Sequence, residues 1–299
     1  MKTRSTLTLA AALAVTLPHA QAAGHVLQNA RLAVTFDDSA VFSFADADRV
    51  DAIAWIDSQG TPRANYVAAG GPSHCGDPQE YFGQSYGEPE GTTPLMVFGG
   101  VRDKWTGTGA LKGVAATSVA GFCDTAPSAA TKTTYKLATA TNQLSELQVT
   151  RVFGFGASTP VFSGHGLRAY VARVPLAAYP TVLAPNAAGT VVESYNAGGC
   201  GADCEVTDWN GRWFADDDGA GNGLMVIRSA SSTAPALLAV NNDSFSASNL
   251  TSIVLLQPTG GWKTKVTEVE YLCFYDTTSW PAAARNAGKL PKGCAGTKP

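Results

Sequence analysis

Alternation of apolar and polar residues dominates this chain, and this period of two predicts β-strands. The alternating stretches are short, and clusters of Gly, Pro, Asn, Asp or Thr separate them. Such spacing is typical of antiparallel sandwiches and barrels, so we expect an all-β fold, one large antiparallel β-sandwich. The expected strands cover residues 26–36, 52–57, 95–101, 114–123, 131–137, 144–155, 167–174, 190–194, 223–228, 236–240, 252–256 and 263–275.

Two segments depart from this alternation. Ser279 as a cap, Pro281 in the first turn and the alanine-rich residues 282–285 predict one short C-terminal helix, which ends at Gly288. Residues 61–93 show no strand pattern and are rich in Gly, Pro and aromatic residues. A loop of this length is usually functional or disordered.

The first 22 residues have the composition of a secretory signal peptide. Lys2 and Arg4 precede an apolar run at 7–17, which is too short to cross a bilayer, and residues 20–22 (Ala-Gln-Ala) match a cleavage pattern. We therefore expect residues 23–299 to form a single secreted or periplasmic β-sandwich domain, with a C-terminal helix, a disulfide-tethered tail and no membrane association.

Export to an oxidising compartment implies that the six cysteines form disulfides. Sequence order suggests the pairs Cys75–Cys123, Cys200–Cys204 and Cys273–Cys294, although counting alone does not determine the connectivity. The last pair would attach the tail to the sheet. A zinc site is the alternative, but paired Cys-x-x-Cys units and histidines at zinc spacing are absent from the sequence.

The charge composition argues against one class of binding partner, nucleic acids. Charged residues make up 15% of the chain, the formal net charge is −3, and the lysines and arginines are scattered. Nucleic-acid binding needs clustered basic residues to neutralise phosphates, so we expect no nucleic-acid partner.

The strand expected at 263–275 carries the clearest candidate chemistry. Glu268 and Glu270 alternate onto one face together with Val266, Leu272 and Phe274, which places the two carboxylates about 7 Å apart along the strand. If that face lines a cleft, burial and mutual repulsion would raise one carboxyl pKa into the range of acid–base catalysis. Alternatively, the two glutamates lie where the strand projects beyond the sheet, paired with Lys or Arg.

Two histidines are further catalytic or binding candidates. His165 lies between glycines in an expected loop, which would expose its ring, and Arg168 follows at the start of a strand. His74 lies within the 61–93 loop, which could form the rim of a pocket. Each could equally belong to a structural turn or tethered loop.

Aromatic residues suggest contacts with sugars. Trp209 and Trp213 are interleaved with Asp, Asn and Arg in residues 208–214, and Tyr195 precedes them. Aromatic faces stack on flat apolar ligand surfaces while the polar residues bond hydroxyl groups. A core role for one of the tryptophans is the alternative.

An acidic turn is a candidate calcium site. Asp216 and Asp218 belong to three consecutive aspartates beside the Gly-rich residues 219–223, and oxygen ligands in such a loop suit Ca²⁺. The EF-hand spacing is not met, so an acidic surface turn is the alternative. No other cofactor is indicated.

The order of several segments resembles the galactose-mutarotase-like β-supersandwich of aldose epimerases and polysaccharide-active enzymes. The resemblance lies in an opening strand at 27–34, later strands at 213–215 and 223–227, and a carboxylate-bearing strand after the Gly-rich turn at 260–262. It implies a carbohydrate-active supersandwich over most of the mature chain. The epimerase motif of an Asn-His pair and an aromatic residue is absent, so no catalytic residue is transferred.

Three functions are consistent with these features. The first is a polysaccharide lyase or epimerase-like enzyme, in which Glu270 or Glu268 abstracts a proton, His165 acts as the acid, and Arg168 or Arg151 holds a uronate carboxylate. The second is a non-catalytic carbohydrate-binding protein that uses the aromatic residues above. The third is a secreted hydrolase whose nucleophile no motif reveals.

Overall fold

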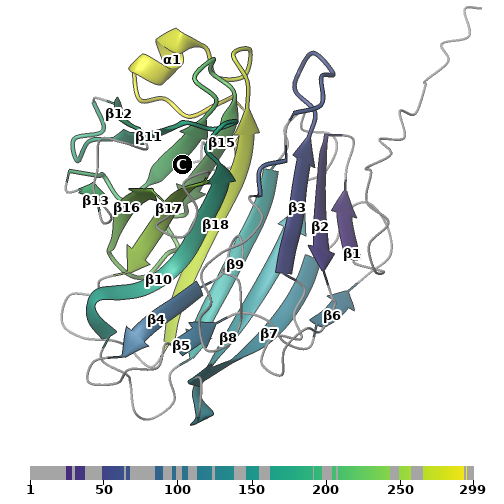
Figure 1. Ribbon diagram of the computed structural model, residues 1–299, viewed down its shortest axis with the longest axis vertical. Helices are drawn as coiled ribbons and strands as arrows, with labels where there is room; N and C mark the ends of the chain where they lie inside the picture. Colours follow the sequence, from purple (N-terminus) through teal and green to yellow (C-terminus); the bar gives the residue numbers. More distant parts are fainter. Residues whose placement is uncertain are drawn as a thin grey trace, which may run out of the picture.

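The computed structural model describes residues 25–28, 31–37, 49–63, 65–67, 85–89, 96–98, 103–106, 113–122, 125–137, 146–154, 162–190, 192–196, 204–206, 208–242, 249–256, 265–292 and 294. These residues form antiparallel sheets and one short helix, as the alternation predicts (Figure 1). The elements are β1 (His25–Gln28), β2 (Leu32–Asp37), β3 (Arg49–Trp55), β4 (Ser85–Pro89), β5 (Met96–Phe98), β6 (Asp103–Thr106), β7 (Gly113–Phe122), β8 (Thr125–Leu137), β9 (Glu146–Gly154), β10 (Phe162–Pro175), β11 (Thr181–Pro185), β12 (Val192–Asn196), β13 (Cys204–Val206), β14 (Trp213–Asp217), β15 (Gly223–Arg228), β16 (Ala236–Asn242), β17 (Asn249–Leu256), β18 (Lys265–Tyr275) and α1 (Ala282–Asn286).

Two sheets contain these strands. β1, β2 and β3 form a three-stranded sheet, and the others follow the order β12-β11-β14-β15-β18-β9-β8-β7-β5-β4-β10-β17-β16-β13, with β6 paired to β7. One cluster of buried side chains joins β9, β15 and β18 to β10, β16 and β17, and to β2 and β3. The long sheet therefore turns back on itself, and its two halves and the small sheet enclose one core.

The observed strands differ from the predicted ones in several places; β6, β11 and β13, for example, lie outside the expected ranges. Residues 26–36 were expected to form one strand, but they form the β1–β2 hairpin, in which His25 lies opposite Phe36. The consecutive polar residues Gln28 and Asn29 interrupt the alternation at the end of β1, and the prediction of one strand overlooked this signal. β4 lies inside the stretch 61–93 that was expected to lack strands, because its sequence, SYGEP, has no alternation.

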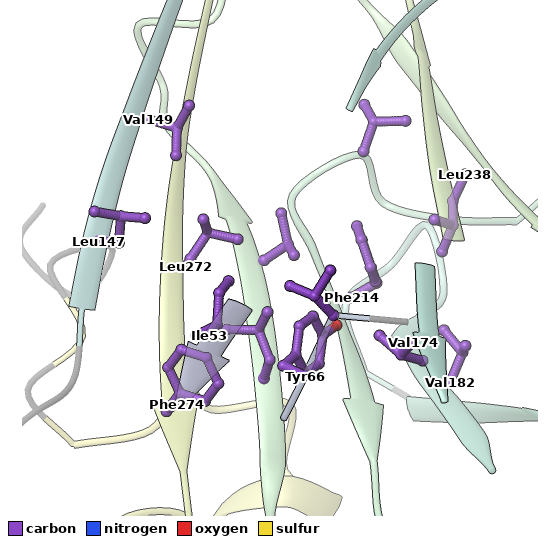
Figure 2. Packing of buried hydrophobic residues seen from close by; sticks show 14 of the residues in the cluster. Ile53, Tyr66, Leu147, Val149, Val174, Val182, Phe214, Leu238, Leu272 and Phe274 are labelled. Atoms are coloured by element: carbon purple, nitrogen blue, oxygen red, sulfur yellow. The ribbon is translucent and has the colours of Figure 1, made fainter. Parts of the chain in front are cut away.

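The interior face of the main sheet is set by strand parity. In β18, Val266, Leu272 and Phe274 point into the main core, whereas Cys273 and Tyr275 point to the opposite face. The aromatic ring of Tyr66, from the segment after β3, is inserted among Ile53, Phe214 and Phe274 in this core (Figure 2).

A second apolar cluster covers the opposite face of β14, β15 and β18. Trp280 packs edge-on against Trp213 and Tyr275, with ring centroids 5.6 and 4.7 Å apart, and its indole N–H donates to the Lys289 carbonyl over 2.5 Å. This burial holds α1 and the tail against the sheet.

Helix α1 occurs where the sequence predicts it, but it begins differently. Pro281, not Ser279, is the N-cap. The Ser279 hydroxyl instead bonds the backbone of Asp276. Gly288, with φ of +64°, follows the helix end, as predicted, because glycine adopts this left-handed conformation without steric cost.

The predicted Cys273–Cys294 disulfide is present. Cys75, Cys123 and Cys200 lie outside the described residues, as does the side chain of Cys204, so the other two pairs stay predictions. Within the described part of the chain, α1 is too short to cross a bilayer, and no longer apolar helix occurs.

Replacing both Cys273 and Cys294 by alanine should lower the free energy of unfolding by about 3 kcal/mol, because the bridge closes a loop of 21 residues and restricts the unfolded chain. Urea unfolding of the oxidised protein and of the variant measures this difference. An unchanged midpoint and slope would show that the tail is held without the bridge.

Candidate functional site

Four charged side chains lie on the interior face of three neighbouring strands. Arg151 comes from β9, Glu268 and Glu270 from β18, and Arg228 from β15. The backbone register places Arg151 opposite Glu268 and Arg228 opposite Glu270. The ion pairs instead run diagonally, Arg151 to Glu270 and Arg228 to Glu268. We call these four residues the charge cluster.

Arg228 holds Glu268 in a fixed position. Its Nε and Nη2 atoms donate to the two carboxylate oxygens of Glu268, the second over 2.9 Å. Nη1 donates to the Gly211 carbonyl and Nη2 also to the Ala234 carbonyl. Such two-pronged, charge-assisted bonding is geometrically specific, so Glu268 has little freedom to move.

Glu270 is bonded less completely. Its Oε2 accepts from Arg151 Nη1 over 2.8 Å, but its Oε1 is buried and has no hydrogen-bond partner among the described residues. Burial raises the pKa of Glu270 to about 8; Arg151 opposes this rise, and the neighbouring Glu268 adds to it. At neutral pH this carboxyl group therefore carries a proton that it can donate.

Two different environments thus lie side by side on one strand. Both glutamates are 0% exposed, which corrects the alternative that placed them beyond the edge of the sheet. The expected pairing with arginine is present, but inside the sandwich. The rise in the pKa of one carboxyl group has the expected direction and cause, with desolvation as the largest contribution.

A second acidic centre lies on the same face, separated from the charge cluster by one row of side chains. The cross-strand register aligns Phe214, Val226 and Leu272 in an apolar row, with Asp216 beyond it. Asp216 accepts hydrogen bonds from the hydroxyl groups of Tyr66 and Ser252, and burial raises its pKa to about 7.

The aromatic residues predicted to bind sugar are not presented as a platform. Trp209 is buried in the main core, where its indole N–H donates to the Trp213 carbonyl over 2.7 Å. Trp213 is buried in the second cluster, and Tyr195 is half-buried against the core. The structure corrects the prediction for both tryptophans, because their rings fill the interior.

His165 and Arg168 lie within strand β10, which corrects the loop expected around His165. The strand begins at Phe162, before the start at residue 167 that the sequence pattern predicts. Their side chains lie outside the described residues, and so does all of His74. The proposed roles of these three residues stay predictions.

In the acidic turn, hydrogen bonds to Asp218 hold the backbone in place. Asp216 points into the sandwich, whereas Asp218 accepts hydrogen bonds from the backbone of Ala220 and Asn222 and from the Asn222 side chain. Asp217 accepts from the Tyr275 hydroxyl. In the described part of the chain, no three His, Cys, Asp or Glu side chains are grouped as a metal site, so the predicted pair Asp216 and Asp218 is not assembled.

Sequence reasoning missed Arg228, Tyr66 and Ser252. The sequence contained a signal for the inward position of Arg228, because this residue alternates onto the same face as Leu224 and Val226 in the predicted strand 223–228. Tyr66 and Ser252 had none, because their contacts with Asp216 join positions 150 and 36 residues apart.

Neither the protein-family models nor the curated proteins compared with this chain gave a match. Among solved structures, the chain is similar to an α-galactosidase from Lactobacillus brevis, with a TM-score of 0.52 and 11% identity over 85% of this chain and 39% of that one. It is also similar to an α-galactosidase of the GH36 class from Geobacillus stearothermophilus, solved with stachyose, with a TM-score of 0.50 and 11% identity over 85% and 40% of the two chains. The likeness shows a common fold, and this chain spans about two fifths of the length of those enzymes.

Breaking one ion pair of the charge cluster should destabilise the fold strongly. Arg228→Met should lower the free energy of unfolding by about 3–5 kcal/mol, because it leaves the buried Glu268 without its donors. The double variant with Glu268→Met should lose less than the sum of the two single variants. Lys265→Met, which removes an exposed cation from the same strand, should change little. Strictly additive losses in chemical denaturation would show that the pair is not coupled.

The pKa of Glu270 predicts a pH dependence of stability. Its folded value of about 8 lies above its ordinary value, so its contribution is complete at acid pH and is lost as the pH rises through about 8. The slope is up to about 1.4 kcal/mol per pH unit for one group. Chemical denaturation between pH 5 and 9 should give a flatter profile for Glu270→Gln. Equal slopes in both proteins would contradict the shift.

Proposed function

We propose that this protein is an exported carbohydrate-active protein and that the charge cluster is its acid–base centre. The observation that carries the proposal is the difference between Glu268, held at both oxygens by Arg228, and Glu270, one oxygen of which has no hydrogen-bond partner in the described part of the chain. Enzymes that use two carboxyl groups typically place them in unlike environments, which separate the pKa values.

Hydrolysis of a glycosidic bond is the reaction that this arrangement supports best. Glu270, protonated at neutral pH, suits the general acid that protonates the leaving oxygen, and Glu268 suits the base that activates water. Same-face neighbours on a strand are about 7 Å apart, and the carboxyl groups of inverting glycosidases are about 6.5–9.5 Å apart. The α-galactosidases of similar fold, one of them solved with stachyose, supply the substrate class to test first.

The lyase or epimerase hypothesis has less support. In that hypothesis Glu270 or Glu268 is the base, and Glu270, whose pKa is near 8, is largely protonated at neutral pH. It also uses Arg168 or Arg151 to hold a uronate carboxylate, and the Arg151 guanidinium already donates to Glu270. The galactose-mutarotase-like resemblance supports carbohydrate recognition without distinguishing these reactions.

Export is part of the proposal. The N-terminal 22 residues match a secretory signal, and the Cys273–Cys294 disulfide is of the kind that persists in oxidising compartments. A secreted or periplasmic location would bring the protein into contact with extracellular glycans.

Turnover and binding should be measured on raffinose, stachyose and a uronate-containing polysaccharide. We expect release of reducing sugar from a galactoside, and a loss of about 100-fold or more in kcat for Glu270→Gln and for Glu268→Gln, because each removes one proton-transfer group. Asp208→Asn, a change of an exposed carboxylate, is the matched control and should keep full activity.

The outcomes separate the alternatives. Binding without turnover, unchanged in the two glutamate variants, would leave a carbohydrate-binding protein and overturn the catalytic assignment. Unsaturated products from the uronate polymer would favour the lyase. Neither binding nor turnover on any of the glycans would contradict the proposal as a whole.

A further inference from the structure

Asp216 lies at the point where three separate parts of the chain meet. It belongs to β14, and its two carboxyl oxygens accept hydrogen bonds from the hydroxyl groups of Tyr66, which follows β3, and Ser252, which is in β17. All three residues are 0% exposed. Hydroxyl groups are therefore the donors to this carboxyl group.

The groups that face Asp216 do not compensate a negative charge. Its neighbour Asp217 adds a like charge, and Tyr66, Tyr179 and Tyr275 present neutral hydroxyl groups around it. The nearby cations are engaged elsewhere in the described residues: Arg63 pairs with Asp57, and Arg285 with Asp217. A protonated Asp216 can keep both hydrogen bonds, whereas an ionised one is a buried charge without a cation.

Tyr66 connects this centre rigidly to the three-stranded sheet. Its backbone N–H donates to the Ile53 carbonyl of β3 over 3.1 Å, and the Asn65 side chain accepts from the N–H groups of Ile53 and Val67. Its ring packs edge-on against Tyr179 and Phe274. A force on the Tyr66 hydroxyl is thus transmitted to β3.

We propose that Tyr66, Asp216 and Ser252 form a proton-operated latch that fastens the three-stranded sheet to the main sheet. The latch is closed while Asp216 holds a proton. When Asp216 ionises, the charged carboxylate is more stable in water than in the core, so the segment 65–67 and β3 separate locally from β14 and β17. The raised pKa of Asp216, about 7, places this transition near neutral pH.

The latch does not depend on the carbohydrate assignment. Its opening would loosen the cover over Leu272 and Phe274, which lie on the same strand face as the charge cluster. A solute could then approach the interior from this side. The latch exists or fails whether or not the charge cluster is catalytic.

Native-state hydrogen exchange of the full oxidised protein tests the proposal between pH 5.5 and 8.5, after correction for the intrinsic pH dependence of exchange. In the wild-type protein, protection of amides in residues 50–67 should fall by up to tenfold per pH unit as the pH rises from 5.5 to about 7, because the opened latch releases a proton that the closed latch holds. Above about pH 7 the protection should level off, since Asp216 is then ionised in both states. Amides of β15 and the C-terminal half of β18 should stay protected.

Asp216→Asn should make the protection of residues 50–67 independent of pH, because the amide copies the neutral acid. Asp218→Asn, two residues away in the turn, is the matched control and should keep the wild-type profile. Ser252→Ala, which keeps the acid and removes one donor to the ionised form, should extend the fall to higher pH. It serves as a second test if Asp216→Asn does not fold.

Three results would overturn the latch. One is wild-type protection of residues 50–67 that does not change with pH. Another is an equal fall in Asp216→Asn, or, if that variant does not fold, a profile of Ser252→Ala identical to that of the wild type. The third is a simultaneous loss of protection in β15 and β18, which would mean that Asp216 controls global stability and not a local opening.

Discussion

Charges buried between the two halves of the sheet impose the main constraint on this fold. Glu268, Glu270, Arg151 and Arg228 project into a space that is otherwise lined by Leu, Val, Phe and Tyr. Desolvating such groups costs several kcal/mol per ion unless partners restore the lost hydrogen bonds. The strands β9, β18 and β15 must therefore keep one register, since a shift by one residue would turn every charged group to the opposite face.

The diagonal pairing within the charge cluster has a chemical consequence. Arg151 faces Glu268 across the strands but pairs with Glu270, and Arg228 faces Glu270 but pairs with Glu268. Both carboxylate oxygens of Glu268 accept hydrogen bonds, whereas one oxygen of Glu270 has no partner among the described residues. One strand thus carries a carboxyl group held firmly in an ion pair and another that burial keeps protonated at neutral pH. This asymmetry, more than the number of carboxylates, connects the fold to acid–base chemistry.

The two faces of the main sheet carry different kinds of side chain and are covered in different ways. The inner face holds the charge cluster and the Asp216 centre, separated by an apolar row. The outer face is closed by Trp280, α1 and the bridged tail. The Cys273–Cys294 disulfide holds the tail on the outer face covalently, whereas hydrogen bonds to Asp216 hold the three-stranded sheet on the inner face. We therefore expect the tail to separate from the main sheet less readily than the three-stranded sheet does.

The sequence by itself determined the fold class and the short helix, because these depend on local alternation and on the residues that start and stop a helix. For the one described disulfide, sequence order suggested the pair, and the structure confirmed it. It also placed Glu268 and Glu270 on one face with the correct apolar neighbours, since strand parity is a local property. The prediction did not separate the β1–β2 hairpin, although the consecutive polar residues Gln28 and Asn29 interrupt the alternation there.

The tertiary structure alone decided which groups meet. It assigned Arg228 to Glu268 and Arg151 to Glu270, and it joined Tyr66 and Ser252 to Asp216 across long stretches of chain. It also turned Trp209 and Trp213 into core residues. Burial and hydrogen-bond partners arise from strand order and from the folding of one sheet half over the other, and neither follows from the pattern along a single strand.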